Sequence, residues 1–409
     1  MSFPAYTPVA RSTGTYLPPA TIQRRWRDKV RVWWREIDKV LLLLIVALMG
    51  IGLIAVAAAS PASADQLSTA KERLDGFMFF KRHIVFQLMG LSLMIGLSFL
   101  DRDQARRLGI LVGAIMLALL FVVPIIGEEK NGARRWINVG MSLQPSEFLK
   151  PGFAIICAWV LSWKVREPNL PVIWYVSGFF GLIAGLLMLQ PNLGDAILFG
   201  GIWLVMVLLA GMPWQRIAIL GGVGATGLVL AYMFYDNARH RIDGFLGGGT
   251  AFDQVDLAQR TITAGGWTGT GLWLGMRKMN LPEAHTDYIF SVIGEEFGLL
   301  ACGAIVMLYC ALVMRALSRL VGEDNLFALL AAAGLITQFG GQAFINILVN
   351  LKLFPSKGMT LPLISYGGSS TLAVCFTLGL LLAITRRNPF LARENGGLRD
   401  LIERKEERP

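Results

Sequence analysis

The stretch Leu281-Pro282-Glu283-Ala284-His285-Thr286-Asp287-Tyr288-Ile289-Phe290 leads from a polar, glycine-rich segment into a long apolar run. That run is long enough to cross a bilayer, because a spanning helix needs about 20 apolar residues. Asp287 therefore stands at the expected mouth of a membrane helix. An ionisable group at membrane depth is costly to bury, which makes Asp287 a functional candidate. The alternative is that Asp287, with Thr286, only caps the helix that follows.

Composition places the whole chain in the membrane class. Hydrophobic residues make up 54% of the 409 and charged residues 16%, whereas a soluble domain carries about 25% charged residues. Runs of apolar residues approach or exceed the roughly 18 that span a bilayer. We predict an all-α integral membrane protein, a polytopic bundle of ten transmembrane helices, over residues 39–60, 84–100, 108–126, 146–163, 172–189, 194–210, 216–235, 287–314, 325–350 and 362–385.

The distribution of Lys and Arg sets the expected orientation. The two tails and alternate loops hold 23 of the 38 basic residues, the opposite loops hold 14, and Lys150 lies within a span. Cytoplasmic segments carry the basic excess, so both termini are predicted to be cytoplasmic and Asp287 to face outward. The net charge of +10 fits anionic lipid head groups and requires no nucleic acid.

Three parts follow along the chain. Residues 1–38 form a basic cytoplasmic tail, partly disordered, whose tryptophans at helical spacing indicate either an interfacial helix or a basic topogenic signal. Residues 39–387 form the membrane domain, with a large outer loop at 236–286, and 388–409 form a charged cytoplasmic tail. The glycines of the outer loop suit either a mobile lid or a flexible connector, since loops of this length usually have a function or are disordered.

Several polar groups lie within or beside the predicted spans. Lys150 is one helical turn from Glu147, so the two can form a self-satisfying ion pair or belong to a substrate site. Asp195, Glu295 and Glu296 have the same two readings, because intramembrane charges either pair or line pathways. The segment 352–370 combines lysines, hydroxyls and adjacent glycines, which can form a polar cavity or pack helices closely. The four cysteines and three histidines show no metal-ligand spacing.

Together these residues resemble the SEDS family (shape, elongation, division and sporulation) over about residues 40–388. The resemblance is carried by six stretches: Arg134 to Ile137, Gln144 to Lys150, Gln190 to Asp195, Leu281 to Phe290, Gly294 to Gly298 and Pro362 to Ser370. The stretch from Pro282 to Asp287 and the long basic tail are more similar to the cell-division branch than to the elongation branch. Tyr288 stands where a phenylalanine is expected, which is a conservative change.

The resemblance implies a peptidoglycan glycosyltransferase of the bacterial inner membrane, acting at the division septum. It implies lipid II and a nascent glycan on undecaprenyl pyrophosphate as substrates. It also implies a class B penicillin-binding protein, a transpeptidase, and other division-complex membrane proteins as partners. Asp287 matches the essential aspartate, and Arg135, Lys150 and Lys357 match basic residues proposed to hold the pyrophosphate. Further substrate-binding candidates are Gln144, Glu147, His285, Ser365, Tyr366 and Ser369, while Asp195, Glu295 and Glu296 are supporting candidates.

The chemistry needs one base and a cation. The donor linkage is α and the product β, so the acceptor hydroxyl must attack from the opposite face, with Asp287 as general base. Pyrophosphate leaves as an anion, which Arg135 and Lys150 would stabilise. No cofactor is required, although Mg²⁺ or Mn²⁺ could share that role. A flippase for the lipid-linked precursor and a non-catalytic division scaffold are the alternatives. A flippase would place its polar groups at the midplane.

Overall fold

The computed structural model describes residues 26–68, 73–130, 133–138, 140, 142–165, 167, 169–234, 239, 243, 254–355 and 358–386. Asp38–Arg386 form one compact unit, and the terminal segments Met1–Ile37 and Arg387–Pro409 form another. In the terminal unit, the basic and tryptophan-rich stretch of the tail folds as the helix α1 (Trp26–Glu36). Its location at the membrane surface stays a prediction.

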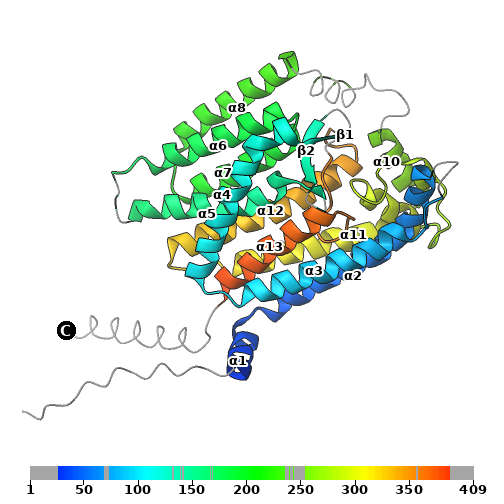
Figure 1. Cartoon of the computed structure of the whole chain (residues 1–409), viewed down its shortest axis with the longest axis horizontal. Helices are drawn as coiled ribbons and strands as arrows, with labels where there is room; N and C mark the ends of the chain where they lie inside the picture. Colours follow the sequence, from blue (N-terminus) through cyan, green and yellow to red (C-terminus); the bar gives the residue numbers. More distant parts are fainter. Residues whose placement is uncertain are drawn as a thin grey trace, which may run out of the picture. The chain divides into compact units, whose positions relative to one another are not determined.

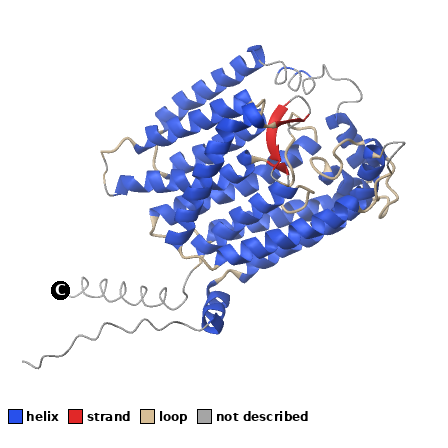
Figure 2. Cartoon of the chain, viewed as in Figure 1, coloured by secondary structure: helices blue, strands red, loops and turns tan. Residues whose placement is uncertain are grey.

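The compact unit contains ten apolar helices among its described residues (Figures 1 and 2). Nine are long and apolar enough to cross a membrane, and α7 is apolar but has 17 residues. This confirms the predicted multi-pass helical bundle. The helices are α2 (Lys39–Leu67), α3 (Met78–Ser98), α4 (Arg102–Ile126), α5 (Pro145–Ser162), α6 (Val172–Leu189), α7 (Leu193–Leu209), α8 (Trp214–Phe234), α11 (Ile289–Ser318), α12 (Leu326–Asn350) and α13 (Gly368–Thr385).

The centre of the bundle is formed by α12 and α13, whose apolar side chains are mostly buried. α12 packs on α5 and α7, while α13 packs on α3, and α11 packs on α2. Segments from the two ends of the sequence therefore lie side by side, as the blue and red ribbons show in Figure 1. α8 lies at the edge of the bundle with only 7% of its most apolar window buried. Most of its surface thus faces outward from the protein.

Ion pairs close the end of the bundle that the basic residues predict to be cytoplasmic. Asp38, which caps α2, accepts hydrogen bonds from the guanidinium groups of Arg315 and Arg319 near the end of α11. Arg102 at the start of α4 forms a bidentate pair with Glu323, at 3.0 and 2.9 Å. The contacts of Asp38 place the start of α2 and the end of α11 at the same height along the bundle.

The opposite end carries structure that the sequence pattern did not predict. Three short strands form a small antiparallel sheet in the order β1-β2-β3, drawn in red in Figure 2. They are β1 (Glu128–Lys130), β2 (Ala133–Asn138) and β3 (Ser142–Leu143). Among the described residues, the remaining elements are α10 (Gln254–Ala264) and the 3-10 turns η1 (Trp163–Val165) and η3 (Arg277–Asn280). The outer loop at 236–286 is therefore partly structured, and α13 begins at Gly368 rather than at 362.

Over the described residues, the glycine-rich segment after α10 is packed against α11. α11 is interrupted at Gly298, where φ is +82° and a Cβ would overlap Trp267 O. Gly269, with φ of +83°, has no room for a Cβ beside Glu296 O. Only glycine permits both the left-handed backbone and this close approach. The segment fills the break in α11 with its own backbone.

Candidate active site

Two asparagines of α12 hold the backbone of Asp287. Asn346 Nδ2 and Asn350 Nδ2 donate to Asp287 O at 2.8 and 3.1 Å. Asn350 Oδ1 accepts from Ser291 N and Oγ in the first turn of α11, at 3.2 and 2.7 Å. The N-cap of α11 is Tyr288, with no side-chain capping hydrogen bond, so Asp287 is not at the capping position. The capping alternative for Asp287 is therefore not supported.

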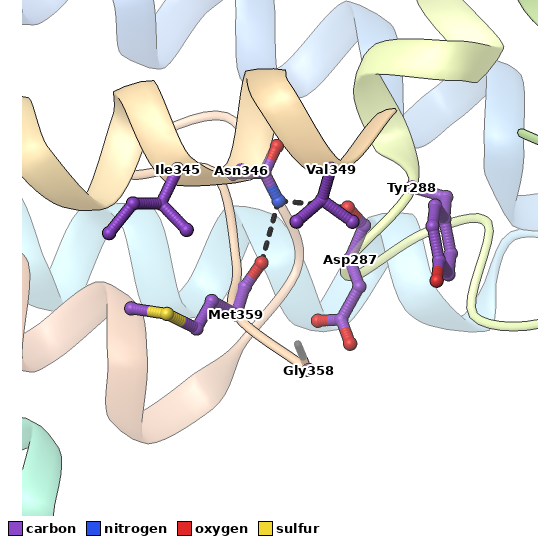
Figure 3. Close-up of a pocket in the computed structure, with 7 residues that line it drawn as sticks. All are labelled: Asp287, Tyr288, Ile345, Asn346, Val349, Gly358 and Met359. Atoms are coloured by element: carbon purple, nitrogen blue, oxygen red, sulfur yellow. Dashed lines mark hydrogen bonds between the residues drawn. The ribbon is translucent and has the colours of Figure 1, made fainter. Parts of the chain in front are cut away.

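The carboxylate of Asp287 opens onto a small pocket (Figure 3). Its side chain is directed toward Gly358, and a Cβ on Gly358 would lie 3.6 Å from Asp287 Oδ2. Asp287 is half-buried, whereas Gly358 is exposed. The pocket is open to solvent and is lined by Asp287, Tyr288, Ile345, Asn346, Val349, Gly358 and Met359. The carboxylate thus has access to a ligand from the Gly358 side.

The segment before α13 forms the other wall of the Asp287 loop. Ser365 Oγ donates to Thr286 O at 2.5 Å, and Tyr366 N donates to His285 O at 2.9 Å. The Tyr366 ring lies 5.5 Å from the His285 ring, which also contacts Phe79 at 4.1 Å. Ser365, Tyr366 and His285 therefore support the backbone of the loop. His285 is buried, and burial lowers its pKa to about 4 although Glu283 opposes the shift.

Lys150 lies in a closed cluster away from the pocket lining. Its Nζ is 2.6 Å from Glu147 Oε1 and 3.0 Å from Asp195 Oδ1, and its side chain has no exposed surface. Ser146 Oγ and Asn192 Nδ2 both donate to Asp195 Oδ2 at 2.8 Å. The predicted pair of Glu147 and Lys150 is present, and Asp195 joins it from α7. In this arrangement the ammonium has two carboxylate partners and no open path to a phosphate.

Arg135 and Gln144 lie next to this cluster on the sheet side. Arg135, on β2, donates from Nε to Gln190 O at 3.0 Å and from its guanidinium to Pro191 O. Gln144 Nε2 donates to Ser146 Oγ at 3.1 Å. Arg135 is half-exposed, so part of its surface remains accessible beyond the turn it binds. Ser369 is buried at the start of α13, and Lys357 lies outside the described residues.

Glu295 and Glu296 fasten the glycine-rich segment to α11. Glu295 accepts from Arg277 N at 2.6 Å and from Lys278 N at 2.9 Å. Glu296 accepts from Trp273 N and pairs with Lys278 Nζ. Both carboxylates are buried and occupied by this loop. The two side chains therefore link the loop to α11.

Sequence reasoning missed three side chains that hold parts of this arrangement together. Lys278 pairs with Glu296, and Asn346 and Asn350 hold Asp287. A signal for the asparagines was present, because two amides one helical turn apart in an apolar run must find partners inside the bundle. Which backbone oxygen they would bind was not readable from their spacing. Among the described residues, no group of three or more His, Cys, Asp and Glu side chains is placed to hold a metal ion.

Comparison with known proteins agrees with this arrangement. Residues 39–389 match the FtsW/RodA/SpoVE family of cell cycle proteins. A probable peptidoglycan glycosyltransferase FtsW of Caulobacter vibrioides is 35% identical over 365 residues, covering 89% of this chain and 93% of that protein. Its counterpart in Halorhodospira halophila is 36% identical, covering 85% of this chain and 90% of that protein. The chain therefore belongs to the FtsW/RodA/SpoVE family.

Solved structures show the same fold. A chain from a structure on polymerization and crosslinking by a peptidoglycan synthase complex superposes with a TM-score of 0.68 and 28% identity. The match covers 86% of this chain and 98% of that one. The rod shape determining protein RodA of Thermus thermophilus superposes with a TM-score of 0.63 and 27% identity, covering 86% and 97%. The ten-helix arrangement is thus the fold of these membrane proteins.

Proposed function

We propose that this chain is a peptidoglycan glycosyltransferase that polymerises lipid II, with Asp287 as its general base. The observation that carries the proposal is the half-buried carboxylate at the pocket, attached to a backbone that Asn346 and Asn350 hold in place. A catalytic base must be within hydrogen-bond reach of the proton it removes, and a fixed backbone limits the positions of its oxygens. Membership of the family supports the same reaction.

In the proposed reaction, Asp287 takes the proton of the acceptor sugar hydroxyl. The hydroxyl oxygen forms a bond to the anomeric carbon of the donor glycan, and the bond from that carbon to the pyrophosphate oxygen breaks. Attack from the face opposite the leaving group converts the α linkage into a β linkage. Undecaprenyl pyrophosphate departs as an anion, so the site needs positive charge near it more than a second acid.

Two cationic groups are the proposed source of that charge. Lys357 directly precedes Gly358, the residue that the Asp287 carboxylate faces. Arg135 has accessible surface beside the Gln190-Pro191 turn, and a guanidinium suits bidentate phosphate contact. Lys150 has a structural role in this scheme, because its cluster with Asp195 also holds Asn192 beside that turn.

A divalent cation at this pocket would need ligands beyond those that the described residues supply. They provide no cluster of metal-binding side chains, and Asp287 is the one carboxylate among the seven residues that line its pocket. Magnesium sites that use one protein carboxylate rely on substrate phosphates for further ligands. No step of the proposed reaction is therefore assigned to Mg²⁺ or Mn²⁺.

The setting we propose is the bacterial inner membrane at the division septum, with both termini cytoplasmic. The proposed partner is a class B penicillin-binding protein that crosslinks the strands, together with other division proteins. Support comes from the FtsW relatives and from the superposition on a chain of a peptidoglycan synthase complex. A flippase is less well supported, because Glu295 and Glu296 are occupied by the outer loop.

The test is polymerisation of purified lipid II by the purified protein with its partner. We expect glycan strands from the unchanged protein and a loss of about 100- to 10,000-fold for Asp287→Asn, the range that a general base supplies. Glu283→Gln is the matched control, since it neutralises an exposed carboxylate on the same loop, and it should retain activity. Polymerisation by Asp287→Asn at the normal rate would remove the proposed base. Transport of lipid II without polymerisation would instead indicate a flippase.

A further inference from the structure

The loop segment Trp267–Met276 exposes five large apolar side chains, and this set is called the apolar shelf below. Trp267 is 71% exposed, Leu274 68% and Met276 74%, and Leu272 and Trp273 are also exposed. Soluble surfaces rarely carry a contiguous patch of this kind, so it indicates contact with a partner or a membrane. The height of the shelf along the bundle decides between these.

The shelf is attached to α2 far from the end of that helix. Trp273 Nε1 donates to Ala57 O at 3.1 Å, and Lys278 Nζ donates to Ala58 O at 3.0 Å. Ala57 lies about 28 Å along α2 from Asp38, at 1.5 Å per residue. The hydrocarbon region of a bilayer is about 30 Å thick. If Asp38 marks one boundary of that region, the shelf meets α2 at the other.

The helices α11 and α3 place the shelf at a similar height along the bundle. Leu299 N and Leu300 N donate to Gly266 O and Trp267 O, and Leu300 lies about 23 Å along α11 from Arg315, the partner of Asp38. α3 has 21 residues, a length of about 30 Å. Phe77, just before its first residue, contacts Trp273 edge-on at 6.2 Å. Three helices therefore place the shelf at the hydrocarbon boundary on the Asp287 side.

The side chains of α11 change from buried to partly exposed at the shelf. From Ile289 to Glu296 every residue of α11 is buried by protein. Beyond the break at Gly298, Leu300, Met307 and Met314 are each more than 60% exposed, as expected of a helix surface that faces lipid. The exposed side chains of the shelf extend this lipid-facing surface toward the Asp287 side.

Backbone N–H groups in and next to the shelf donate hydrogen bonds within the protein, as a location without water requires. Thr270 N and Gly271 N donate to Glu295 O and Glu296 O at 2.9 and 3.0 Å. Trp273 N, Arg277 N and Lys278 N donate to the carboxylates of the same two residues. Irregular backbone at membrane depth is tolerated when the protein satisfies its polar groups. Glu295 and Glu296 supply those acceptors.

We propose that the apolar shelf Trp267–Met276 is embedded in the leaflet on the Asp287 side and binds the acyl chains of its lipids. Trp267 and Trp273 lie at the interface, where tryptophan is enriched in membrane proteins. Leu272, Leu274 and Met276 contact the upper part of the acyl chains. The shelf then fixes the height of the loop that leads to Asp287, independently of which reaction Asp287 performs.

The test measures the depth of single bimane labels in the full-length protein in vesicles. Leu274→Cys and Met276→Cys are made with Cys310→Ser, which removes the exposed native thiol. We expect lipids brominated near the head-group end to remove most of the fluorescence, and aqueous iodide to remove little. Met307→Cys, on the exposed surface of α11, is the lipid control, and Gln259→Cys, exposed on α10, is the water control.

Quenching of the Leu274 and Met276 labels by iodide to the extent seen at Gln259 would overturn the proposal. Protection of these labels from both quenchers would also overturn it, because a protein surface rather than lipid would then cover the shelf. The readout does not depend on polymerisation. It therefore separates failure of this proposal from failure of the proposed function.

Discussion

Glu147 and Asp195 lie against Lys150 inside the bundle, whereas Asp287 opens onto a pocket at the end of α11. In the first cluster the charged atoms themselves are held by ion pairs at 2.6 and 3.0 Å. At Asp287 the structure holds the backbone carbonyl, through Asn346 and Asn350, and directs the carboxylate outward. The charges of the Lys150 cluster are buried and held by one another. The carboxylate of Asp287, which is proposed to act in catalysis, is positioned through hydrogen bonds to its main chain.

Substitution of Lys150 should give the largest effect on stability. Lys150→Met leaves two buried carboxylates without their cation, and breaking a buried pair in this way costs about 3–5 kcal/mol. We expect a large drop in the thermal unfolding temperature in detergent, with the remaining folded protein still active. Asp287→Asn should show the reverse, with the unfolding temperature retained and activity lost.

The triple variant Glu147→Gln, Lys150→Met, Asp195→Asn is the control for Lys150. It removes all three charges, so it should recover much of the stability that Lys150→Met loses. If Lys150→Met instead melts normally and abolishes polymerisation, Lys150 contacts the substrate. The contrast between the two clusters would then be wrong.

A pH dependence should distinguish the Asp287 loop from the closed cluster. Burial lowers the pKa of His285 from 6.5 to about 4, so the folded state binds fewer protons than the unfolded state between those values. Its contribution to stability is complete above pH 6.5 and is lost as the pH falls toward 4. At pH 5 the loss is about 2 kcal/mol relative to neutral pH.

His285→Phe should remove this part of the pH dependence, because a phenyl ring can pack against Phe79 and Tyr366 without titrating. The measurement is thermal stability of both proteins between pH 4.5 and 7, a window taken from the two pKa values. Curves that stay parallel across that range would show that His285 is not the titrating group.

The smallest expected effect concerns the backbone of Asp287. Asn350→Ala removes one donor to Asp287 O and the acceptor for Ser291. We expect kcat to fall about tenfold, which corresponds to about 1.4 kcal/mol. KM should change little, because the pocket lining does not include Asn350. Gln342→Ala is the matched control on α12, since Gln342 donates to Thr360 O instead. Equal losses in both variants would contradict a positioning role.

The apolar pattern was sufficient to predict the helices. The predicted spans 172–189 and 325–350 agree with α6 and α12 to within one residue, because long apolar runs leave little choice of structure in a bilayer. The α13 prediction began six residues early, at 362. There, Ser365 and Tyr366 bond to the Asp287 loop instead of continuing a helix. Tertiary hydrogen bonds of this kind leave no periodic trace in the sequence.

The candidate site was predictable only where its residues are neighbours in the chain. Asp287 was identified from its position before an apolar run, and the pair of Glu147 and Lys150 from helical spacing. The link from Lys150 to Asp195, and from Asn346 to Asp287, joins different helices, and no spacing rule reports it. The sheet was missed because its strands have only 3, 6 and 2 residues, too short for an alternating pattern.

The pairing of early with late helices has a consequence for biosynthesis. Asp38 at the start of α2 bonds to Arg315, 277 residues further along, and Gln87 of α3 donates to Leu363 O, 276 residues further along. A ribosome must therefore release almost the whole chain before the first two spans acquire these partners. Until then their polar groups rely on water, lipid head groups or the insertion machinery, so chains truncated before Arg315, which lack both partners, should be substrates for membrane quality control.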